Sequence, residues 1–330
     1  MAGIHRRQMT LGLGAAALLA PIALPTVVKA QDIRVQNGAA MAGVSQVVIG
    51  SFVVAFLTER TDSARAGGGL LGGGFGGRSS ARSTLAGVTD AEFQAATDAA
   101  YADFLTQLQT AGYQVADRAA WVAAMTRSSP EENGREQGLI MARESRAESR
   151  IFSPTALGGP MIPRESLGHL MGRGMGQNAS GVHMSMNSQT YARETGQAVL
   201  SAFYVVDFAN AETYGGWFRN SSAVSVQAGL ALVPDLSMLI AFAPNRRIVT
   251  ATLKEPVAVG GDFGTFAETT SSGHRAAEIA TNVIGVLGGI GTRSSKRFTM
   301  QADPDRWVQG VQQLSTAANT SFLQTIRAGR

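Results

Sequence analysis

The sequence predicts an α/β (or α+β) fold, in which a single domain holds a mixed sheet packed by two or three helices. Residues 46–57 (QVVIGSFVVAFL) are continuously apolar and rich in β-branched and aromatic side chains, which is typical of a buried strand. A helical pattern of apolar residues follows between Phe93 and Ala111, and a second one closes the chain after Pro304. Because no shift in composition marks a linker, residues 31–330 are expected to form one domain.

The first helix has sequence signals at both of its ends. Thr89 or Asp90 is expected to cap it, Glu92 places an acid in its first turn, and Gly112 ends it. The elements expected next are a short strand at 113–116 and a second helix at 118–126.

The middle of the chain lacks a clear periodicity. Residues 130–188 are first charged and then rich in Gly, Pro, Met and Ser, and are expected to form a long irregular insertion. Within them Glu144, Arg146, Glu148 and Arg150 alternate in sign at every second position, which we interpret as a solvated face.

Regular structure is expected to resume after the insertion. The expected elements are a helix at 189–199 and strands at 200–208, 222–233, 236–243 and 246–253. Asp303 should then cap a C-terminal amphipathic helix with Pro304 at its first position. The apolar face of this helix consists of Trp307, Val311, Leu314, Ala318 and Phe322.

Residues 1–30 have the composition of a signal peptide. Arg6 and Arg7 precede an apolar run at 11–28, and a small residue stands before Gln31. The arginine pair suits a twin-arginine signal, and a general secretory (Sec) signal explains the same residues. The sequence therefore predicts an exported protein in the periplasm, with association to the outer membrane as one option.

Export changes the charge balance of the chain. Three of the 28 Lys and Arg residues lie in the leader, which leaves 25 against 24 Asp and Glu residues. So small an excess, without basic clusters, excludes nucleic acid as a partner. The chain has no Cys, which excludes disulfides, thiol nucleophiles and a Cys-linked lipid. No window beyond the leader approaches the roughly 20 apolar residues of a membrane helix, so no transmembrane span is expected in the mature chain.

Residues 67–77 (GGGLLGGGFGG) match the pattern G-x-G-x-x-G twice. In a dinucleotide site this pattern leads directly from a strand into a helix, whereas here about ten residues separate it from the strand. We therefore expect a Gly-rich loop at 64–83 that closes a hairpin, with low-complexity disorder as its plainest interpretation. Its large apolar side chains, Leu70, Leu71 and Phe75, favour contact with a partner or with a membrane surface.

A glycine turn with aromatic side chains is the second candidate contact surface. Tyr214, Trp217 and Phe218 would anchor an interface if they are exposed, and would be core residues if they are buried.

The insertion contains residues that suit Cu(I). Thioether and imidazole groups at short spacing bind this ion, and Met also fills irregular gaps in a core, so both interpretations stay open. The candidate ligands are His169, Met171, Met175, His183, Met184 and Met186.

Hydrolytic motifs are absent from the sequence. It contains no G-x-S-x-G, S-x-x-K or H-E-x-x-H, although a triad built from distant residues stays open. Asp207 interrupts an expected buried strand, so it is either a paired structural acid or an active-site group.

The order of elements, with LSAFYVVDF (200–208) followed by VQAGLALVPDLSMLIAFAPNRRIVTATLKEP (226–256), resembles two periplasmic domains. These are the α/β domain of the curli secretion channel subunit and the N-terminal domain of the Tol-system translocation protein. Members of the channel family are lipidated on Cys and carry two long hairpins. This chain has no Cys and only residues 210–221 where such a hairpin would lie, so no pore is expected.

The glycine loop, VVDF and TLKEPVAVGGDFGT are also similar to exported proteobacterial proteins of uncharacterised function. That resemblance implies a location and a fold but no activity. The sequence thus predicts a non-enzymatic cell-envelope protein without a cofactor, which acts through contacts with envelope proteins or with copies of itself. A copper-binding protein and a hydrolase are the alternatives.

Overall fold

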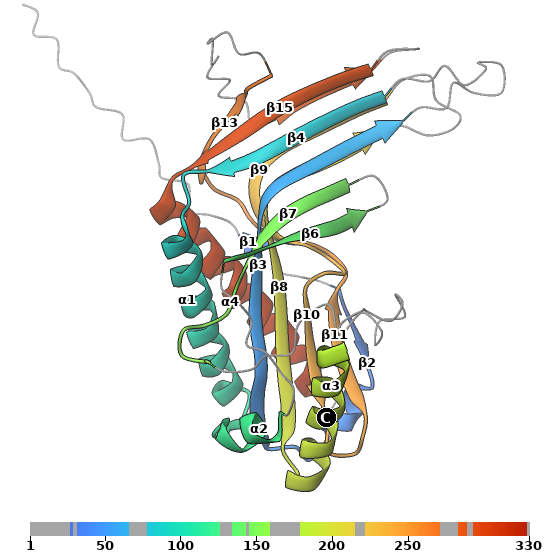
Figure 1. The fold of residues 1–330 in the computed structure, drawn as a ribbon, viewed down its shortest axis with the longest axis vertical. Helices are drawn as coiled ribbons and strands as arrows, with labels where there is room; N and C mark the ends of the chain where they lie inside the picture. The colour runs from blue at the N-terminus through green and yellow to red at the C-terminus, as the bar shows by residue number, and fades with distance from the viewer. Residues whose placement is uncertain are drawn as a thin grey trace, which may run out of the picture.

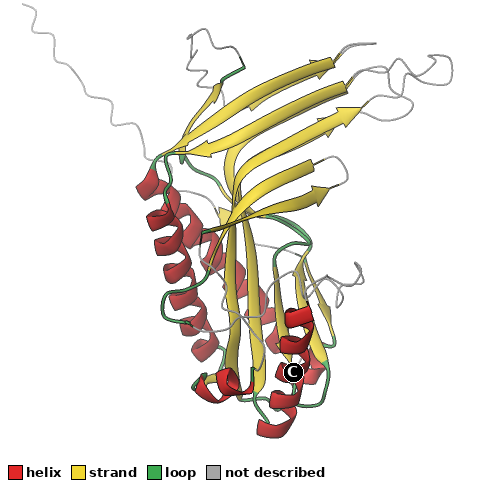
Figure 2. Cartoon of the chain, in the orientation of Figure 1, coloured by secondary structure: helices red, strands yellow, loops and turns green. Residues whose placement is uncertain are grey.

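The computed structural model describes residues 27–28, 32–65, 78–125, 134–142, 145–158, 179–214, 222–270, 283–288 and 293–328. Long strands extend from an α/β body that holds the helices (Figure 1). Figure 2 shows the helices confined to this body, whereas the extension consists of strands. The predicted α/β fold with a mixed sheet and a C-terminal helix is therefore confirmed.

The sheet of the body is centred on the parallel pair β3 and β8. β5 joins β3 in parallel, and β10, β11 and β2 continue from β8 in antiparallel order. From one edge to the other the strands are β5 (Gln114–Val115), β3 (Gln46–Arg65), β8 (Ala198–Tyr214), β10 (Met238–Phe242), β11 (Ile248–Leu253) and β2 (Ile33–Gln36). In the core between the sheet and the helices, the buried ring of Tyr204 contacts both Phe52 and Phe322.

Helices cover both faces of this sheet. α1 (Asp90–Thr110) and α4 (Pro304–Ala328) pack against each other on one face. α2 (Ala119–Ala124) and α3 (Ala179–Thr195) lie on the other face (Figure 1). The short 3-10 helix η1 (Gly38–Met41) follows β2.

The predicted helix starts are confirmed in atomic detail. The Thr89 hydroxyl accepts a hydrogen bond from the Ala91 N–H at 3.3 Å, and the Glu92 carboxylate accepts one from the Thr89 N–H at 2.7 Å. At α4 the Asp303 carboxylate accepts from the Arg306 N–H at 3.1 Å. These side chains satisfy N–H groups that have no partner within the helix.

Beyond the helices the strands form two distal layers. The first distal layer has the order β6-β7-β3-β4-β15-β13, and the second has the order β8-β9-β14. β9 and β14 contact β4, so the two layers pack face to face. The added strands are β4 (Arg78–Ala86), β6 (Arg135–Ala142), β7 (Ser145–Phe152), β9 (Ser222–Leu232), β12 (Val257–Val259), β13 (Gly264–Glu268), β14 (Val283–Gly288) and β15 (Arg293–Ala302).

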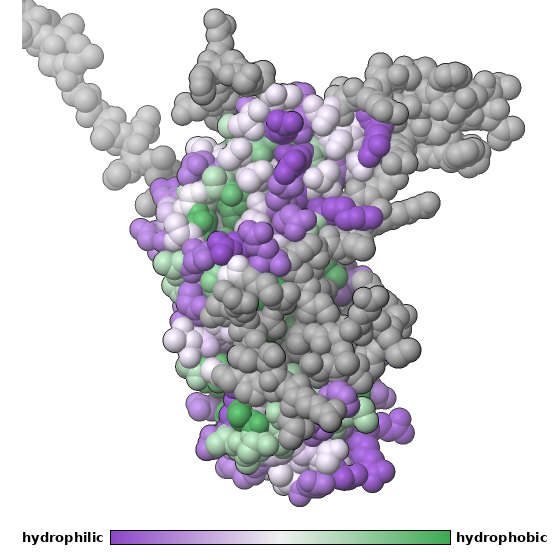
Figure 3. Space-filling model, in the orientation of Figure 1, coloured by the Kyte–Doolittle hydropathy of each residue, from purple (hydrophilic) through white to green (hydrophobic). Residues whose placement is uncertain are grey.

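Side chains of the first distal layer alternate between its two faces. In β4, Arg78 and Arg82 are exposed, whereas Ser79, Ala81 and Ser83 are buried. Figure 3 shows hydrophilic residues gathered over the distal strands on the face that it presents. The inward side chains of β4 are small, which allows this strand and the second layer to approach closely.

Two expected boundaries are wrong. Residues 130–188 are not irregular throughout, because they contain β6, β7 and the first half of α3. The Gly-rich loop is shorter than 64–83, since β3 continues to Arg65 and β4 starts at Arg78. In both places short alternating strands of small and charged residues lack the apolar run that identified β3.

Two residues of the expected leader also lie in the sheet. β1 (Val27–Val28) pairs antiparallel with Val259 and Ala258 of β12. Cleavage after Ala30 would remove this pairing. Within the described residues no helix combines the length and the apolar composition of a membrane span.

Candidate functional site: the fork between β3 and β8

The two central strands of the body separate at one level of the molecule. β3 and β8 run side by side until Phe56 lies opposite Val206. Beyond this level β3 pairs with β4 and β7, and β8 pairs with β9. The register of each strand shifts here, between Leu57 and Glu59 of β3 and in β8 after Asp207. We call this level the fork; bulges of this kind bend strands away from each other.

Three charged side chains are buried immediately beyond the fork. Arg60 and Asp62 come from β3 and Asp207 comes from β8, with exposed fractions of 7%, 1% and 5%. The Arg60 guanidinium binds the Asp62 carboxylate with both Nε and Nη2, at 2.7 and 2.9 Å. Its Nη1 forms an ion pair with Asp207 and donates to the Ala209 carbonyl. We call these three residues the fork cluster, and it joins the two distal layers where they begin.

The bulge of β8 is also held by Asp207. Its Oδ1 accepts a hydrogen bond from the Ala209 N–H at 3.1 Å. The carboxylate therefore satisfies a backbone group that the shifted register releases, while its other oxygen meets Arg60. The sequence left Asp207 as either a paired structural acid or an active-site group, and the structure shows it as a paired acid.

Burial dominates the electrostatics of the cluster. It raises the pKa of Asp207 to about 6, and the positive charge of Arg60 opposes this shift only in part. Burial alone would lower the pKa of Arg60, but Asp207 and Asp62 outweigh it and the pKa of Arg60 is raised. At neutral pH one buried cation thus faces two carboxylates.

This pKa shift predicts a specific pH dependence of stability. Since the pKa of Asp207 in the folded chain is about 6 rather than the ordinary 3.8, the folded state keeps a proton that the unfolded state has already lost. The resulting stabilisation is present near pH 3.8 and disappears as the pH rises through about 6. Relative to Asp207→Asn, the free energy of unfolding of the wild type should fall by about 2 kcal/mol between about pH 4 and pH 7. Urea denaturation of both proteins at stepped pH measures this difference, and a difference independent of pH would contradict the prediction.

The candidate contact residues lie at or beyond the far ends of the distal strands. Tyr214 is the last residue of β8 and pairs with Ala223 of β9. The strand ends Arg65 and Arg78, which flank the Gly-rich segment, pair with each other in the first distal layer. Because β3 and β8 run parallel, their last residues, Arg65 and Tyr214, lie at the same end of the molecule. The other members of the two sets, Leu70, Leu71, Phe75, Trp217 and Phe218, lie outside the described residues.

Of the candidate copper ligands that the structure describes, Met184 lies apart from His183 and Met186. Met184 is fully buried in the core, whereas His183 is exposed and Met186 is 59% exposed on another side of α3. Three further candidates, His169, Met171 and Met175, lie outside the described residues. Among the residues that the structure describes, no group of three or more His, Cys, Asp or Glu side chains could hold a metal ion. Copper binding stays a prediction.

Sequence reasoning singled out Asp207 but missed Arg60 and Asp62. A signal was available, because Arg60 and Asp62 stand two positions apart in TERTD and so share one face of the strand that continues the apolar run. What the sequence does not reveal is that this face meets β8.

No protein-family model, no curated protein and no solved structure matches the chain.

Proposed function

We propose that this chain is a non-enzymatic, exported cell-envelope protein that acts through protein contacts and associates with copies of itself through its distal strands. The observation that carries the proposal is the first distal layer, which extends beyond the helices and ends in two different edge strands (Figure 1). The composition of residues 1–30 supports export.

The two edges of this layer differ in length and position. β6 pairs with β7 and β13 pairs with β15, and no strand of the described residues covers the other side of either one. An edge strand presents a row of backbone N–H and C=O groups that another strand can pair with. Contact between the β6 edge of one copy and the β13 edge of the next joins two different surfaces, and repetition of such a contact builds a ring or a filament.

The fork cluster supports this arrangement, because it connects the layer that carries both edges to β8. In sequence, the predicted contact segments directly follow the last residues of β3 and β8. The Gly-rich segment and the Tyr214, Trp217 and Phe218 tip are therefore proposed to contribute to the contacts.

Proline substitutions in β6 test the proposed edge. Successive backbone N–H groups of a strand point to opposite sides, so Gly138→Pro and Leu139→Pro remove one N–H that faces β7 and one that faces outward. We expect the wild type to form a multimer by light scattering at about 100 µM. The variant that loses the outward N–H should keep the wild-type melting temperature and become monomeric.

The other variant is the control, because loss of a hydrogen bond to β7 should lower the melting temperature. A wild-type protein that is monomeric at this concentration would refute self-association. Two proline variants with the wild-type mass would refute the β6 edge.

A further inference from the structure

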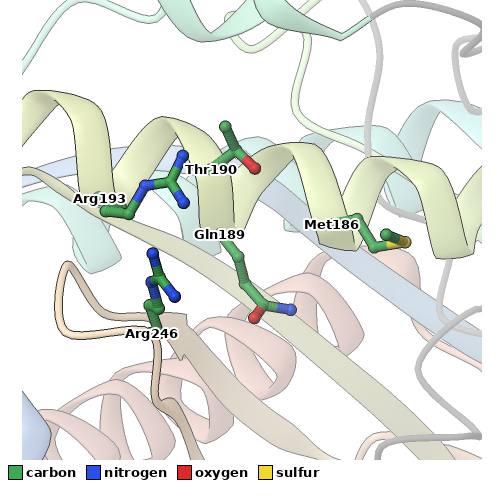
Figure 4. A pocket seen from close by; sticks show the side chains of 5 residues that line it. All are labelled: Met186, Gln189, Thr190, Arg193 and Arg246. Atoms are coloured by element: carbon green, nitrogen blue, oxygen red, sulfur yellow. The ribbon is translucent and has the colours of Figure 1, made fainter.

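A surface cavity of about 220 Å³, open to solvent and lined mostly by exposed side chains, lies on the body of the molecule. It is formed between α3 and the turn that joins β10 to β11. Figure 4 shows Arg246 pointing from this turn toward Arg193 and Gln189 of α3, with Met186 at the other end. Its lining residues are Met186, Gln189, Thr190, Arg193 and Arg246.

The cavity collects positive charge without an acid of its own. Two of its five lining residues are arginines, and none is Asp or Glu. Arg193 contacts the neighbouring Glu194 at 3.2 Å through one of its terminal nitrogens, and this pair is solvent-exposed. Within the described residues the Arg246 guanidinium has no hydrogen bond or ion pair. Two guanidinium groups directed to one cavity repel each other unless an anion lies between them.

The backbone of Arg246 is unusual as well. Its φ is +66°, in the left-handed region that side chains other than Gly, Asn and Asp rarely adopt. Among the described residues the only other non-glycine residues with positive φ are Asn37 and Asp235, which tolerate this region.

The turn that holds Arg246 is closed by its neighbours. The Ala243 N–H donates to the Arg247 carbonyl at 2.9 Å, and the Arg246 N–H donates to the Ala243 carbonyl at 3.1 Å. The positive φ of position 246 in this turn suits glycine, so an arginine at this position lowers the stability of the fold. Local strain that brings a functional group into a cavity is typical of binding sites.

We propose that this cavity binds the phosphate group of a small phosphomonoester or free phosphate. A phosphate carries nearly two negative charges above its second pKa of about 6, which matches two arginines better than a carboxylate does. Guanidinium groups bind phosphate oxygens with paired hydrogen bonds, and the Gln189 amide and the Thr190 hydroxyl are further donors. The Met186 thioether provides an apolar contact for the organic part of an ester.

Titration of the full chain with phenyl phosphate at pH 7.5 tests the site by calorimetry. We expect saturable binding to the wild type and at least a tenfold loss of affinity in Arg246→Gly, since one charge-assisted contact is removed. The melting temperature of Arg246→Gly should equal or exceed that of the wild type, because glycine relieves the positive φ. Folding failure therefore cannot explain the loss.

Arg247→Ala is the matched control. It removes the same charge from the same turn, but Arg247 does not line the cavity. Its affinity should stay within about twofold of the wild type, because it makes no contact with the phosphate. An equal loss of affinity in both variants would show only a general effect of charge and would overturn the site.

Two further ligands identify the bound chemistry. Benzoate should bind at least tenfold more weakly than phenyl phosphate, and equal affinity would overturn the assignment to phosphate. Inorganic phosphate that binds as tightly as phenyl phosphate would assign the site to free phosphate, whereas weaker binding would assign it to an ester. Absence of saturable binding by either phosphate ligand would refute the proposal.

Discussion

Replacing Arg60 by methionine is expected to lower the free energy of unfolding by about 3–5 kcal/mol. Methionine retains an unbranched stem of similar shape but removes the buried cation that binds Asp62 and Asp207. A buried carboxylate without a partner is far more costly than the loss of one hydrogen bond. Chemical denaturation of the variant and the wild type at pH 7 measures the difference.

Two control variants test whether the loss of stability comes from the buried cluster and not from the removal of an arginine in general. Arg82 forms an ion pair with Glu59 on the outer face and its side chain is 55% exposed. Arg82→Met should therefore cost less than about 1 kcal/mol, because solvent screens such pairs. The triple variant Arg60→Met, Asp62→Asn, Asp207→Asn should recover part of the lost stability, since it also removes both buried carboxylates. If Arg60→Met costs no more than Arg82→Met, the fork cluster is not a buried ion-pair cluster.

Replacing Arg60 by methionine should also weaken the proposed self-association. Arg60 connects β3 in the first distal layer to β8 in the second. Without this connection, we expect the amides of β4 and β7 to exchange with solvent faster than those of α1 and α4. Multimer formation should weaken in parallel, because the edge strands belong to the loosened layer.

Local signals explain which elements could be predicted from the sequence. α1 and α4 were predicted correctly because Thr89, Glu92, Asp303 and Pro304 determine where they start through neighbouring residues alone. β7 was missed for the opposite reason. Its alternation of charged and small residues indicates a strand only if the small residues are buried, and the burial of Ala147 and Ser149 depends on the fold around β7.

The fork cluster could be predicted only in part for a related reason. Asp207 stood out because an acid interrupts an apolar strand, but Arg60 lies 147 residues before it. A pair so distant in sequence leaves no periodic signal, and its formation depends on the register between β3 and β8. The strained turn at Arg246 is similar, since its positive φ follows from the hairpin and not from the residue type.

Replacing Trp307 by alanine is expected to have an effect of similar size, about 3–5 kcal/mol of lost stability. Trp307 is 1% exposed, and its ring lies 5.2 Å from the rings of both Phe56 and Phe93. These aromatic residues join α4 to β3 and α1 at the level of the fork, where Phe56 makes the last pairing between β3 and β8. Alanine would leave a large cavity among side chains that cannot close over it.

The matched control for this prediction is Trp307→Phe. Within the described residues the Trp307 indole N–H has no hydrogen-bond partner, so its burial already opposes folding. Phenylalanine keeps an aromatic ring beside Phe56 and Phe93 and removes this polar group. It should therefore cost no more than about 1.5 kcal/mol, although it is smaller than tryptophan. Thermal and chemical denaturation of both variants measure the contrast, and an equal loss in the two would mean that the indole N–H contributes a stabilising contact at this site.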